Sequence, residues 1–421
     1  MNPVRNSPPQ RPSGRASAGA ISNGVKRILI FSLAYVPFVG GAEIAMKEIT
    51  DRLSPEEYVF DMITLRFDSN LPAVEKVGNI TVHRIGFAVP GAKISDRAMP
   101  LRCKIAKLLF PFTALFKALS LGRFDMTWAL MANQAAFAAL FYKWTHPRTP
   151  YFLELQDGRA LRDMTKRQPI LRFLWSMYLA TYKKADLIKA ISHFIEHEVR
   201  AIGYTKSIEV IPNAVDVAKF SAPVPEEELG ALKAKLDKKM GDVFLFTASR
   251  LVLSRGVEDC IRALPHLPGE VKLLIAGDGE DRAKLEAIAK EAQVESRVMF
   301  LGHVGHADLP AYFKVSDIFV RPSVIEGLGS AFLEALAAGI PVVATPVGGI
   351  PDFLTEGETG IFCDVQDPRS LAAAVRRYLD DPALVQRVVV NAKKLVAEKY
   401  EWTMVAEAMR TRVFDRLVTR G

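Results

Sequence analysis

The stretch RPSVIEGLGSAFLEALAAGIPVVATPVGGIPD, residues 321–352, contains a strand end, a glycine-rich loop, a helix and a second strand. The apolar runs on both sides of the helix are typical of parallel strands that are buried on both faces. The loop leads directly into a helix that we expect over 330–338. Two glutamates, Glu326 and Glu334, stand in this apolar unit, although glutamate is seldom fully buried without a partner.

The same alternation of strands and helices extends through the chain on both sides of this unit. We expect strands over 26–32, 58–65, 81–86, 125–130, 151–157, 185–192, 207–213, 242–249, 271–277, 298–302, 317–323, 341–345 and 360–364. We expect helices over 42–53, 171–184, 256–264, 281–291, 307–315, 330–338 and 368–379. Such alternation indicates parallel sheets with helices on both faces. Two series of this kind predict an α/β protein with two doubly wound, Rossmann-like domains that face each other across a cleft, the default ligand site.

A change of composition separates the two series. Residues 221–241, SAPVPEEELGALKAKLDKKMG, carry prolines and then charges, and we interpret them as an interdomain connection with one surface helix. The predicted division is a disordered tail over 1–24, a first domain over 25–220, a second domain over 221–398, and a C-terminal helix over 399–421 that packs back on the first domain. With 421 residues, 49% of them hydrophobic, the chain is long enough for two cores.

Charge and cysteine content limit the partners and the compartment. The net charge of +8 mildly favours phosphates or anionic lipid as partners, but it is too small and too dispersed to predict nucleic-acid binding. Three cysteines, far apart, fit neither a disulfide framework nor a CxxC metal site, so we expect a reducing, cytoplasmic location. No segment reaches the roughly 18 apolar residues of a membrane span. The protein is therefore expected to be cytoplasmic, free or peripheral on the cytoplasmic face of the membrane.

The loop before the 330–338 helix has the properties of an anion site. Its glycines let the backbone approach a ligand closely, and the helix start offers unpaired N–H groups and a positive dipole end. These properties suit a diphosphate. Glu334 lies one turn into the helix, where it can accept hydrogen bonds from a ribose, and Glu326 can do the same for a hexose hydroxyl. The spacing alone fits equally well with one solvent-facing glutamate and one glutamate favoured by the helix dipole.

The segment PSVIEGLGSAFLEALAAGIPVVAT (322–345) resembles the E-x7-E segment of the retaining glycosyltransferases of family four, which have the GT-B fold. Leu328 stands where that family usually has Phe, Ser330 where an aliphatic residue is common, and Asp352 where Glu is usual. Four further stretches resemble the family: SRLVLSRG (249–256), LLIAGDGED (273–281), VMFLGHV (298–304) and EVIPNAVD (209–216). The resemblance extends over about residues 26–420 and is strongest in the second half, which in the family binds the nucleotide sugar.

The resemblance implies a donor site in the second domain. Arg250 and Arg255, with the amides of Leu328 to Ser330, would hold the diphosphate. Arg255 replaces the family's usual lysine, and it can grip phosphate in bidentate fashion. The expected donor-binding residues are Gly41, Arg250, Arg255, Gly277, Gly279, His303, Val304, Glu326, Gly327, Leu328, Gly329, Ser330 and Glu334. The same sequence would also fit if Gly277 and Gly279 were only turn residues without a contact to the donor.

The first domain contributes the expected acceptor side, Gly40, Gln156 and Asp157. In SLAYVPFVGGAEIAMKEI (32–49), the glycines match a loop that lines the family's cleft, although a tight turn explains them almost as well. In YFLELQDGRA (151–160), Gln156 stands where many family members carry His. Glutamine cannot exchange a proton, so we expect it to orient a sugar hydroxyl. The resemblance to the family implies that the acceptor's proton passes to the departing phosphate. The expected catalytic residues are Glu326, Arg250, Arg255 and Asp157, and Asp157 fits equally as the cap of a turn.

Neither a metal nor a cofactor is expected. The seven histidines form no metal pattern, His303 and His306 included, and there is no Asp-x-Asp motif of metal-dependent sugar transferases. The basic and apolar mixtures over 97–123 and 166–184 suit either a membrane interface or a core with snorkelling lysines.

These features together predict a metal-independent, retaining glycosyltransferase. It would move a hexose from a nucleoside-diphosphate sugar to a hydroxyl of a surface glycan, lipid-linked, as in polysaccharide or lipopolysaccharide biosynthesis. A nucleotide-sugar epimerase or hydrolase of the same architecture, or a non-catalytic nucleotide or glycan module, remains open. So do the base (UDP, GDP or ADP), the sugar and the acceptor.

Overall fold

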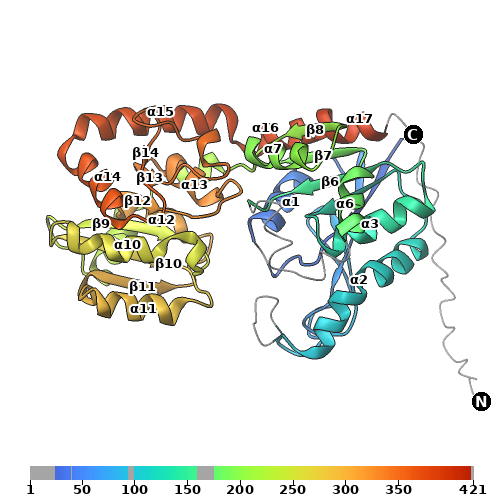
Figure 1. Ribbon diagram of the computed structural model, residues 1–421, viewed down its shortest axis with the longest axis horizontal. Coiled ribbons are helices and arrows are strands. Elements are labelled where there is room, and N and C mark those ends of the chain that lie inside the picture. The colour runs from blue at the N-terminus through green and yellow to red at the C-terminus, as the bar shows by residue number, and fades with distance from the viewer. Residues whose placement is uncertain (1–23, 39, 93–98, 159–174, 419–421) are drawn as a thin grey trace, which may run out of the picture.

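The computed structural model describes residues 24–38, 40–92, 99–158 and 175–418. Two lobes lie side by side, each built on one sheet with helices packed against it (Figure 1). The predicted α/β class with two Rossmann-like domains is confirmed. The expected tail, apart from Gly24, lies outside the described residues, as do the first residues of the helix expected over 171–184 and part of the mixed segments over 97–123 and 166–184.

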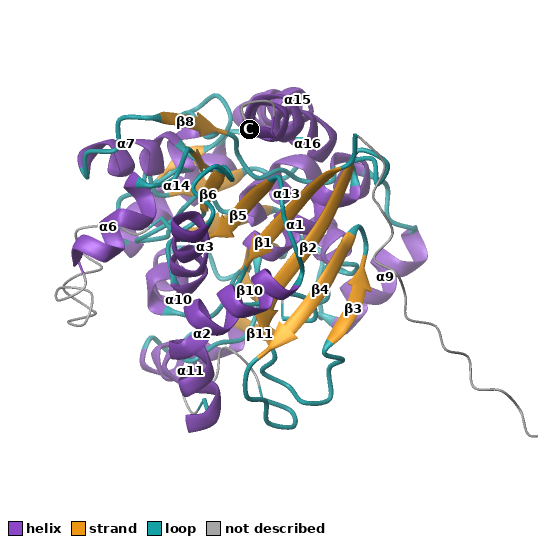
Figure 2. Cartoon of the chain, turned by 90° about the vertical axis from the view of Figure 1, so that its right-hand side faces the viewer, coloured by secondary structure: helices purple, strands orange, loops and turns teal. Residues whose placement is uncertain are grey.

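The first domain contains an eight-stranded sheet with the order β3-β4-β2-β1-β5-β6-β7-β8 (Figure 2). Its strands are β1 (Lys26–Phe31), β2 (Tyr58–Leu65), β3 (Val74–Val77), β4 (Ile80–Ile85), β5 (Met126–Leu130), β6 (Tyr151–Leu155), β7 (Leu187–Ala190) and β8 (Ser207–Val210). Neighbours are parallel except β3 and β4. β3 was not expected from the sequence, because this short edge strand alternates exposed and half-buried residues.

The second domain contains a six-stranded parallel sheet with the order β11-β10-β9-β12-β13-β14. Its strands are β9 (Val243–Ala248), β10 (Val271–Ala276), β11 (Val298–Gly302), β12 (Ile318–Arg321), β13 (Val342–Ala344) and β14 (Ile361–Phe362). The residues of β12 and β13 are buried throughout, which is why their sequences read as continuous apolar runs. One charged residue, Arg321, ends β12 within this buried layer.

The helices connect these strands. In the first domain they are α1 (Gly41–Asp51), α2 (Leu101–Ser120), α3 (Gln134–Thr145), α6 (Trp175–Lys183) and α7 (His193–Ala201). In the second they are α8 (Val217–Ser221), α9 (Glu226–Lys235), α10 (Val257–Ala263), α11 (Arg282–Glu291), α12 (Leu309–Val315), α13 (Ser330–Ala338), α14 (Pro368–Asp380) and α15 (Pro382–Lys399). Short 3-10 turns are η1 (Leu253–Arg255), η2 (Leu264–His266), η3 (Glu295–Arg297) and η4 (Ile350–Asp352).

The end of the chain returns to the first domain as α16 (Trp402–Met409), the π-helical turn η5 (Arg410–Phe414) and α17 (Asp415–Val418). Phe414 lies within aromatic contact distance of four rings in the first sheet, those of Tyr58, Phe60, Trp128 and Phe152. These terminal helices are therefore part of the core of the first domain.

The two connections between the domains run side by side. Val215, which follows β8, donates its N–H to the carbonyl of Tyr400, which follows α15, at 2.9 Å. A buried apolar cluster continues from the first domain, where it includes Ile191, into the second, where it includes Ile350 and Phe353. This cluster brings the loops at the carboxyl ends of both sheets toward one another.

Candidate active site

Loops from both domains meet at residues 326–330. A Cβ atom added to Gly158, which follows β6, would lie 2.2 Å from the carbonyl carbon and oxygen of Glu326. A Cβ on Gly327 would lie 2.7 Å from the carbonyl oxygen of Gln156, and one on Gly41 would lie 3.7 Å from Ser330 Oγ. The structure thus brings the predicted acceptor-side and donor-side segments together.

Glycine shapes this loop and leaves donors free at the start of α13. Gly329 has φ +87°, a conformation that favours glycine, and it is the N-cap of α13. Gly348, at φ +56°, lies so close that an added Cβ would be 1.7 Å from the carbonyl oxygen of Glu326. Within the described part of the chain, no group accepts a hydrogen bond from the backbone N–H of Leu328, Gly329 or Ser330. Together with the helix dipole, these donors form a potential anion site.

Glu326 is 5% exposed and is held by cationic partners. Its Oε2 accepts a hydrogen bond from Arg255 Nη1 at 2.8 Å, a second from Arg321 Nη2, and a third from Ser323 Oγ at 3.3 Å. Arg255 Nη1 also donates to the carbonyl of Ile325 at 2.9 Å. The buried carboxylate is therefore ion-paired, which explains how an apolar segment accommodates it.

Arg321 was not among the site residues expected from the sequence. It is 6% exposed, and its guanidinium lies 5.1 Å from the ring centre of Phe332 in α13. Burial lowers the pKa of Arg321, while the neighbouring charge of Glu326 opposes that effect. A charged residue at the end of an apolar strand was the available indication, because such a residue needs a buried partner.

Glu334 lies on α13 and binds a histidine from the loop after β11. His306 Nε2 lies 3.2 Å from Glu334 Oε1, and Lys219 Nζ from α8 lies 2.8 Å from His306 Nδ1. Because an ammonium group can only donate, Nδ1 must accept, and Nε2 therefore carries the proton that it donates to Glu334. His303 and Val304, expected near the nucleotide base, belong to the same loop.

Arg250 is exposed at the end of β9 and lies near Glu43 of the first domain. Glu43 accepts a hydrogen bond from the N–H of Gly40 at 2.7 Å in the first turn of α1. Burial raises the pKa of Glu43, whereas hydrogen bonds from the backbone and the positive charge of Arg250 oppose the increase. An acid of the first domain thus lies opposite a predicted diphosphate ligand of the second.

Two predicted donor contacts, Gly277 and Gly279, have a clear packing role. Gly277 has φ +133°, and an added Cβ would lie 1.9 Å from the carbonyl oxygen of Ser249; at Gly279 it would lie 2.3 Å from that of Leu251. These glycines let the loop after β10 pack against the loop that carries Arg250. Their contact with a donor stays a prediction.

Gln156 and Asp157 follow β6, and a buried network holds Gln156. Its Nε2 donates to Glu154 Oε1 at 2.7 Å, and its Oε1 accepts from Asn213 Nδ2 at 2.8 Å. Glu154 is fully buried and ion-paired with Lys189 at 2.6 Å. Burial raises the pKa of the Tyr182 hydroxyl, and the charge of the nearby Asp157 adds to this increase. The orienting role of Gln156 and the catalytic role of Asp157 stay predictions.

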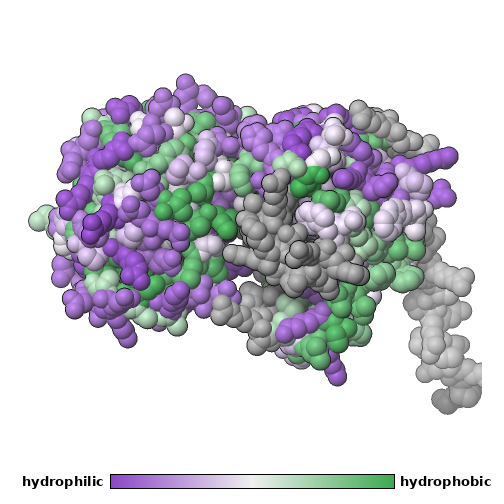
Figure 3. Space-filling view, viewed as in Figure 1, coloured by the Kyte–Doolittle hydropathy of each residue, from purple (hydrophilic) through white to green (hydrophobic). Residues whose placement is uncertain are grey.

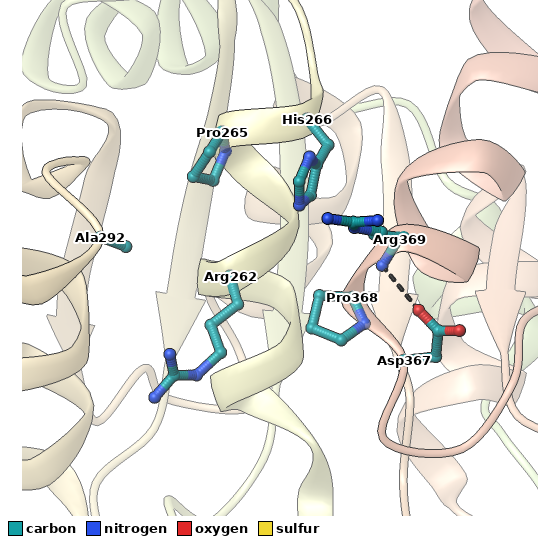
Figure 4. A pocket seen from close by; sticks show the side chains of 7 residues that line it. All are labelled: Arg262, Pro265, His266, Ala292, Asp367, Pro368 and Arg369. Carbon is teal, nitrogen blue, oxygen red and sulfur yellow. Dashed lines mark hydrogen bonds between the residues drawn. The ribbon is translucent and has the colours of Figure 1, made fainter.

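A separate surface cavity of about 440 Å³ lies in the second domain between α10 and α14 (Figure 4). Its lining residues are Arg262, Pro265, His266, Ala292, Asp367, Pro368 and Arg369. None of them belongs to the predicted site. Among the described residues, no three His, Cys, Asp or Glu side chains are grouped so that they could hold a metal ion. None of the described helices combines the length and apolar character that crossing a bilayer requires.

Comparisons with known proteins agree with this architecture. Residues 39–219 match the family model described as Glycosyltransferase Family 4, and residues 230–395 match Glycosyl transferases group 1. An uncharacterized glycosyltransferase of Methanocaldococcus jannaschii is 29% identical over 397 residues, 90% of this chain and 96% of that protein. The GDP-mannose-dependent alpha-(1-6)-phosphatidylinositol monomannoside mannosyltransferase of Mycolicibacterium smegmatis is 31% identical over 232 residues, 52% of this chain and 59% of that protein. The crystal structure of Anabaena HepE in complex with UDP-glucose has a TM-score of 0.73 and 19% identity, covering 92% of this chain and 99% of that one.

Two Rossmann-like domains whose carboxyl-end loops meet at a charged, glycine-rich segment define a GT-B glycosyltransferase. The chain belongs to the group 1 and family 4 glycosyltransferases, with one family model on each half.

Proposed function

We propose that this glycosyltransferase is a metal-independent, retaining hexosyltransferase that uses a nucleoside-diphosphate sugar and glycosylates a hydroxyl of a lipid-linked surface glycan. The observation that carries the proposal is the ion-paired Glu326 beside the unbonded amides of Leu328 to Ser330, at the contact between the domains. Two related proteins support a nucleotide-sugar donor. The mannosyltransferase is named as GDP-mannose-dependent, and HepE was crystallised with UDP-glucose.

On this proposal, the second domain holds the donor. The amides of 328–330 and the guanidinium groups of Arg250 and Arg255 bind the diphosphate, because they supply donors and positive charge without a metal ion. Glu334 binds the ribose and Glu326 the hexose. The same groups stabilise the negative charge that develops on the departing nucleoside diphosphate, and this is where most of the rate enhancement arises.

The acceptor hydroxyl is held from the first domain. Gln156 cannot take up a proton, and its amide is already fixed by Glu154 and Asn213. On this proposal the acceptor's proton passes to the leaving phosphate, and Gln156 orients the hydroxyl. Correct placement of the two substrates contributes the remaining rate.

The test is a panel of UDP, GDP and ADP in thermal-shift assays, followed by incubation of the matching hexose donor with membrane glycolipid extract and mass spectrometry of the product. We expect stabilisation by one nucleoside diphosphate and a product one hexose heavier, with unchanged activity in EDTA. NMR of the product should show the donor's anomeric configuration. Conversion or hydrolysis of the donor without acceptor would instead indicate an epimerase or hydrolase, and binding without any turnover would indicate a non-catalytic module.

The lipid-linked acceptor and a peripheral position on the membrane are supported by α2. Exposed apolar residues recur along it at helical spacing: Leu101, Ile105, Leu108, Phe112, Phe116 and Leu119. Lysines and an arginine accompany them: Arg102, Lys104, Lys107 and Lys117. Figure 3 shows the resulting apolar area over α2 at the lower end of the first domain. An apolar stripe with basic neighbours suits the surface of an anionic membrane.

Co-sedimentation with phosphatidylglycerol vesicles tests this part of the proposal. Phe112→Ser with Phe116→Ser should abolish most of the bound fraction, because these side chains are 53% and 70% exposed and would be the ones inserted. Val390→Ser is the matched control, since Val390 is 59% exposed on α15 of the other domain. A wild-type protein that stays in solution would remove the membrane position.

A further inference from the structure

Two guanidinium groups converge on a single oxygen of Glu326. Oε2 receives Arg255 Nη1, Arg321 Nη2 and Ser323 Oγ. Among the described residues, none donates a hydrogen bond to Oε1. Three donors on one oxygen fix the rotation of the carboxylate, because a planar group held in this way has little freedom to turn.

The hydrogen bonds of this cluster are incomplete. Both guanidinium groups bind one carboxylate directly, with the charge of Glu334 acting from farther away, and Arg321 is 6% exposed with its Nε buried and without a partner in the described part of the chain. Leaving a positive charge in a buried position incompletely paired is unfavourable. A ligand that brings polar or negative groups to this cluster would therefore be favoured there.

We propose that Arg321 is a positioning residue of the donor site, which holds Oε2 of Glu326 so that Oε1 is presented to a hydroxyl of the donor hexose. This inference rests on the proposed function. Arg321 itself does not touch the nucleotide: its contacts are Glu326 and the ring of Phe332 on α13. It acts through Glu326, while Arg255, whose side chain is 24% exposed, keeps its remaining donors for the diphosphate.

The positioning role predicts a selective loss. Arg321→Met keeps much of the side-chain volume but removes the donor to Oε2. We expect the donor sugar's contribution to binding, measured as the ratio of the Kd of UDP to that of UDP-glucose, or of GDP to that of GDP-mannose, to fall about tenfold or more, as for a lost charged hydrogen bond. The Kd of the nucleoside diphosphate alone should change less than about threefold. Arg321→Lys, which can still donate to Oε2, should restore part of the ratio.

A double-mutant cycle separates positioning from a general effect on folding. In a Glu326→Gln background, Arg321→Met should have little further effect on the ratio of Kd values, because its target is already altered. Arg262→Met, on a surface helix in the other cavity, is the control and should leave both constants unchanged. Thermal unfolding of each variant reports stability independently.

The outcomes are distinguishable. An Arg321→Met variant that leaves the ratio unchanged, or lowers it equally with and without Glu326→Gln, overturns the positioning role while the proposed function stands. A wild-type protein that binds none of UDP, UDP-glucose, GDP and GDP-mannose overturns the proposed function and this inference with it. A fall in the ratio of Kd values that Arg321→Met causes only when Glu326 is present supports the inference.

Discussion

Replacing Gly158 with alanine would test whether the contact between the domains is used during the reaction. The added Cβ would lie 2.2 Å from the carbonyl carbon and oxygen of Glu326 and 2.3 Å from the nitrogen of Gly327. Carbon atoms normally pack at about 3.5 Å or more. All three neighbours are backbone atoms, so no side chain can move aside, and the segments after β6 and β12 must separate by more than about 1 Å.

A displacement of this size between reacting groups costs about 100-fold in rate, or about 2.7 kcal/mol of activation free energy. We therefore expect kcat of Gly158→Ala to fall about 100-fold. Binding of the nucleoside diphosphate should change little, because its predicted ligands apart from Gly41, namely Arg250, Arg255 and 328–330, belong to the second domain.

The assay is the initial rate of sugar transfer, with the Kd of the nucleoside diphosphate measured in parallel by calorimetry. Gly269→Ala is the matched control, because no atom lies within 4 Å of the Cβ position of Gly269 and its φ is not in the left-handed region. If Gly158→Ala retained the wild-type kcat, the 326–330 loop would not need its present contact with the first domain. A fall in nucleotide affinity as large as that in kcat would also contradict the argument, because it would place the damage inside the donor site.

Three further expectations concern charge. Arg255→Ala should lower kcat by roughly 100-fold or more, by analogy with lost oxyanion donors, with Arg255→Lys partly active; an unaffected single-turnover rate would refute leaving-group stabilisation. Burial, and after it the charge of Glu258, raises the pKa of Asp259 from 3.8 to about 6. The folded state therefore binds this proton more tightly than the unfolded state does. As a consequence, the free energy of unfolding falls as the pH rises from about 4 to 6. Asp259→Asn should therefore raise the free energy of unfolding at pH 7.5 by about 1–3 kcal/mol and flatten that pH dependence in denaturant titrations, whereas an unchanged slope would contradict the raised pKa. Asp352 accepts a hydrogen bond from the N–H of His193 at the start of α7 at 2.8 Å, and its negative charge there should stabilise the contact between the domains by about 0.3–1 kcal/mol. Asp352→Asn should therefore widen the distribution of interdomain distances measured with spin labels. An unchanged distribution would contradict this contribution.

The fold class and the parallel strands could be predicted from the sequence, because burial on both faces of parallel strands leaves continuous apolar runs. The helices α3, α7 and α15 were not among those expected. β12 and β13 show this most clearly. β3 could not be predicted, since its four residues have no apolar run and pair only at the edge of the sheet. The bounds of several strands were expected too long, as at 207–213, where the observed β8 ends at Val210.

The site was predictable in its segments but not in its contacts. The segment around Glu326 and Glu334 and the segments of Gly41, Gln156 and Asp157 were predicted from the sequence, and the structure shows that they approach one another; their roles toward donor and acceptor stay predictions. The reason for individual glycines was not predictable, because the close approach of Gly158 to Glu326 joins segments 168 positions apart and depends on how the domains meet. Arg321 was not predicted for a different, local reason: the loop after β12 turns back and brings the carboxylate of Glu326, five residues along the chain, to its guanidinium.

Glu326 and Glu334 share an arrangement that makes both suitable for accepting hydrogen bonds from sugar hydroxyl groups. Arg255, Arg321 and Ser323 hold one oxygen of Glu326, and His306 approaches one oxygen of Glu334. In each acid the second oxygen accepts no hydrogen bond from the described residues. A carboxylate with one oxygen fixed and one unbonded pays little conformational entropy when a sugar hydroxyl donates to it. The apolar surroundings then have a purpose: they keep the two acids rigid, because side chains packed at the density of a protein interior cannot turn away from the site.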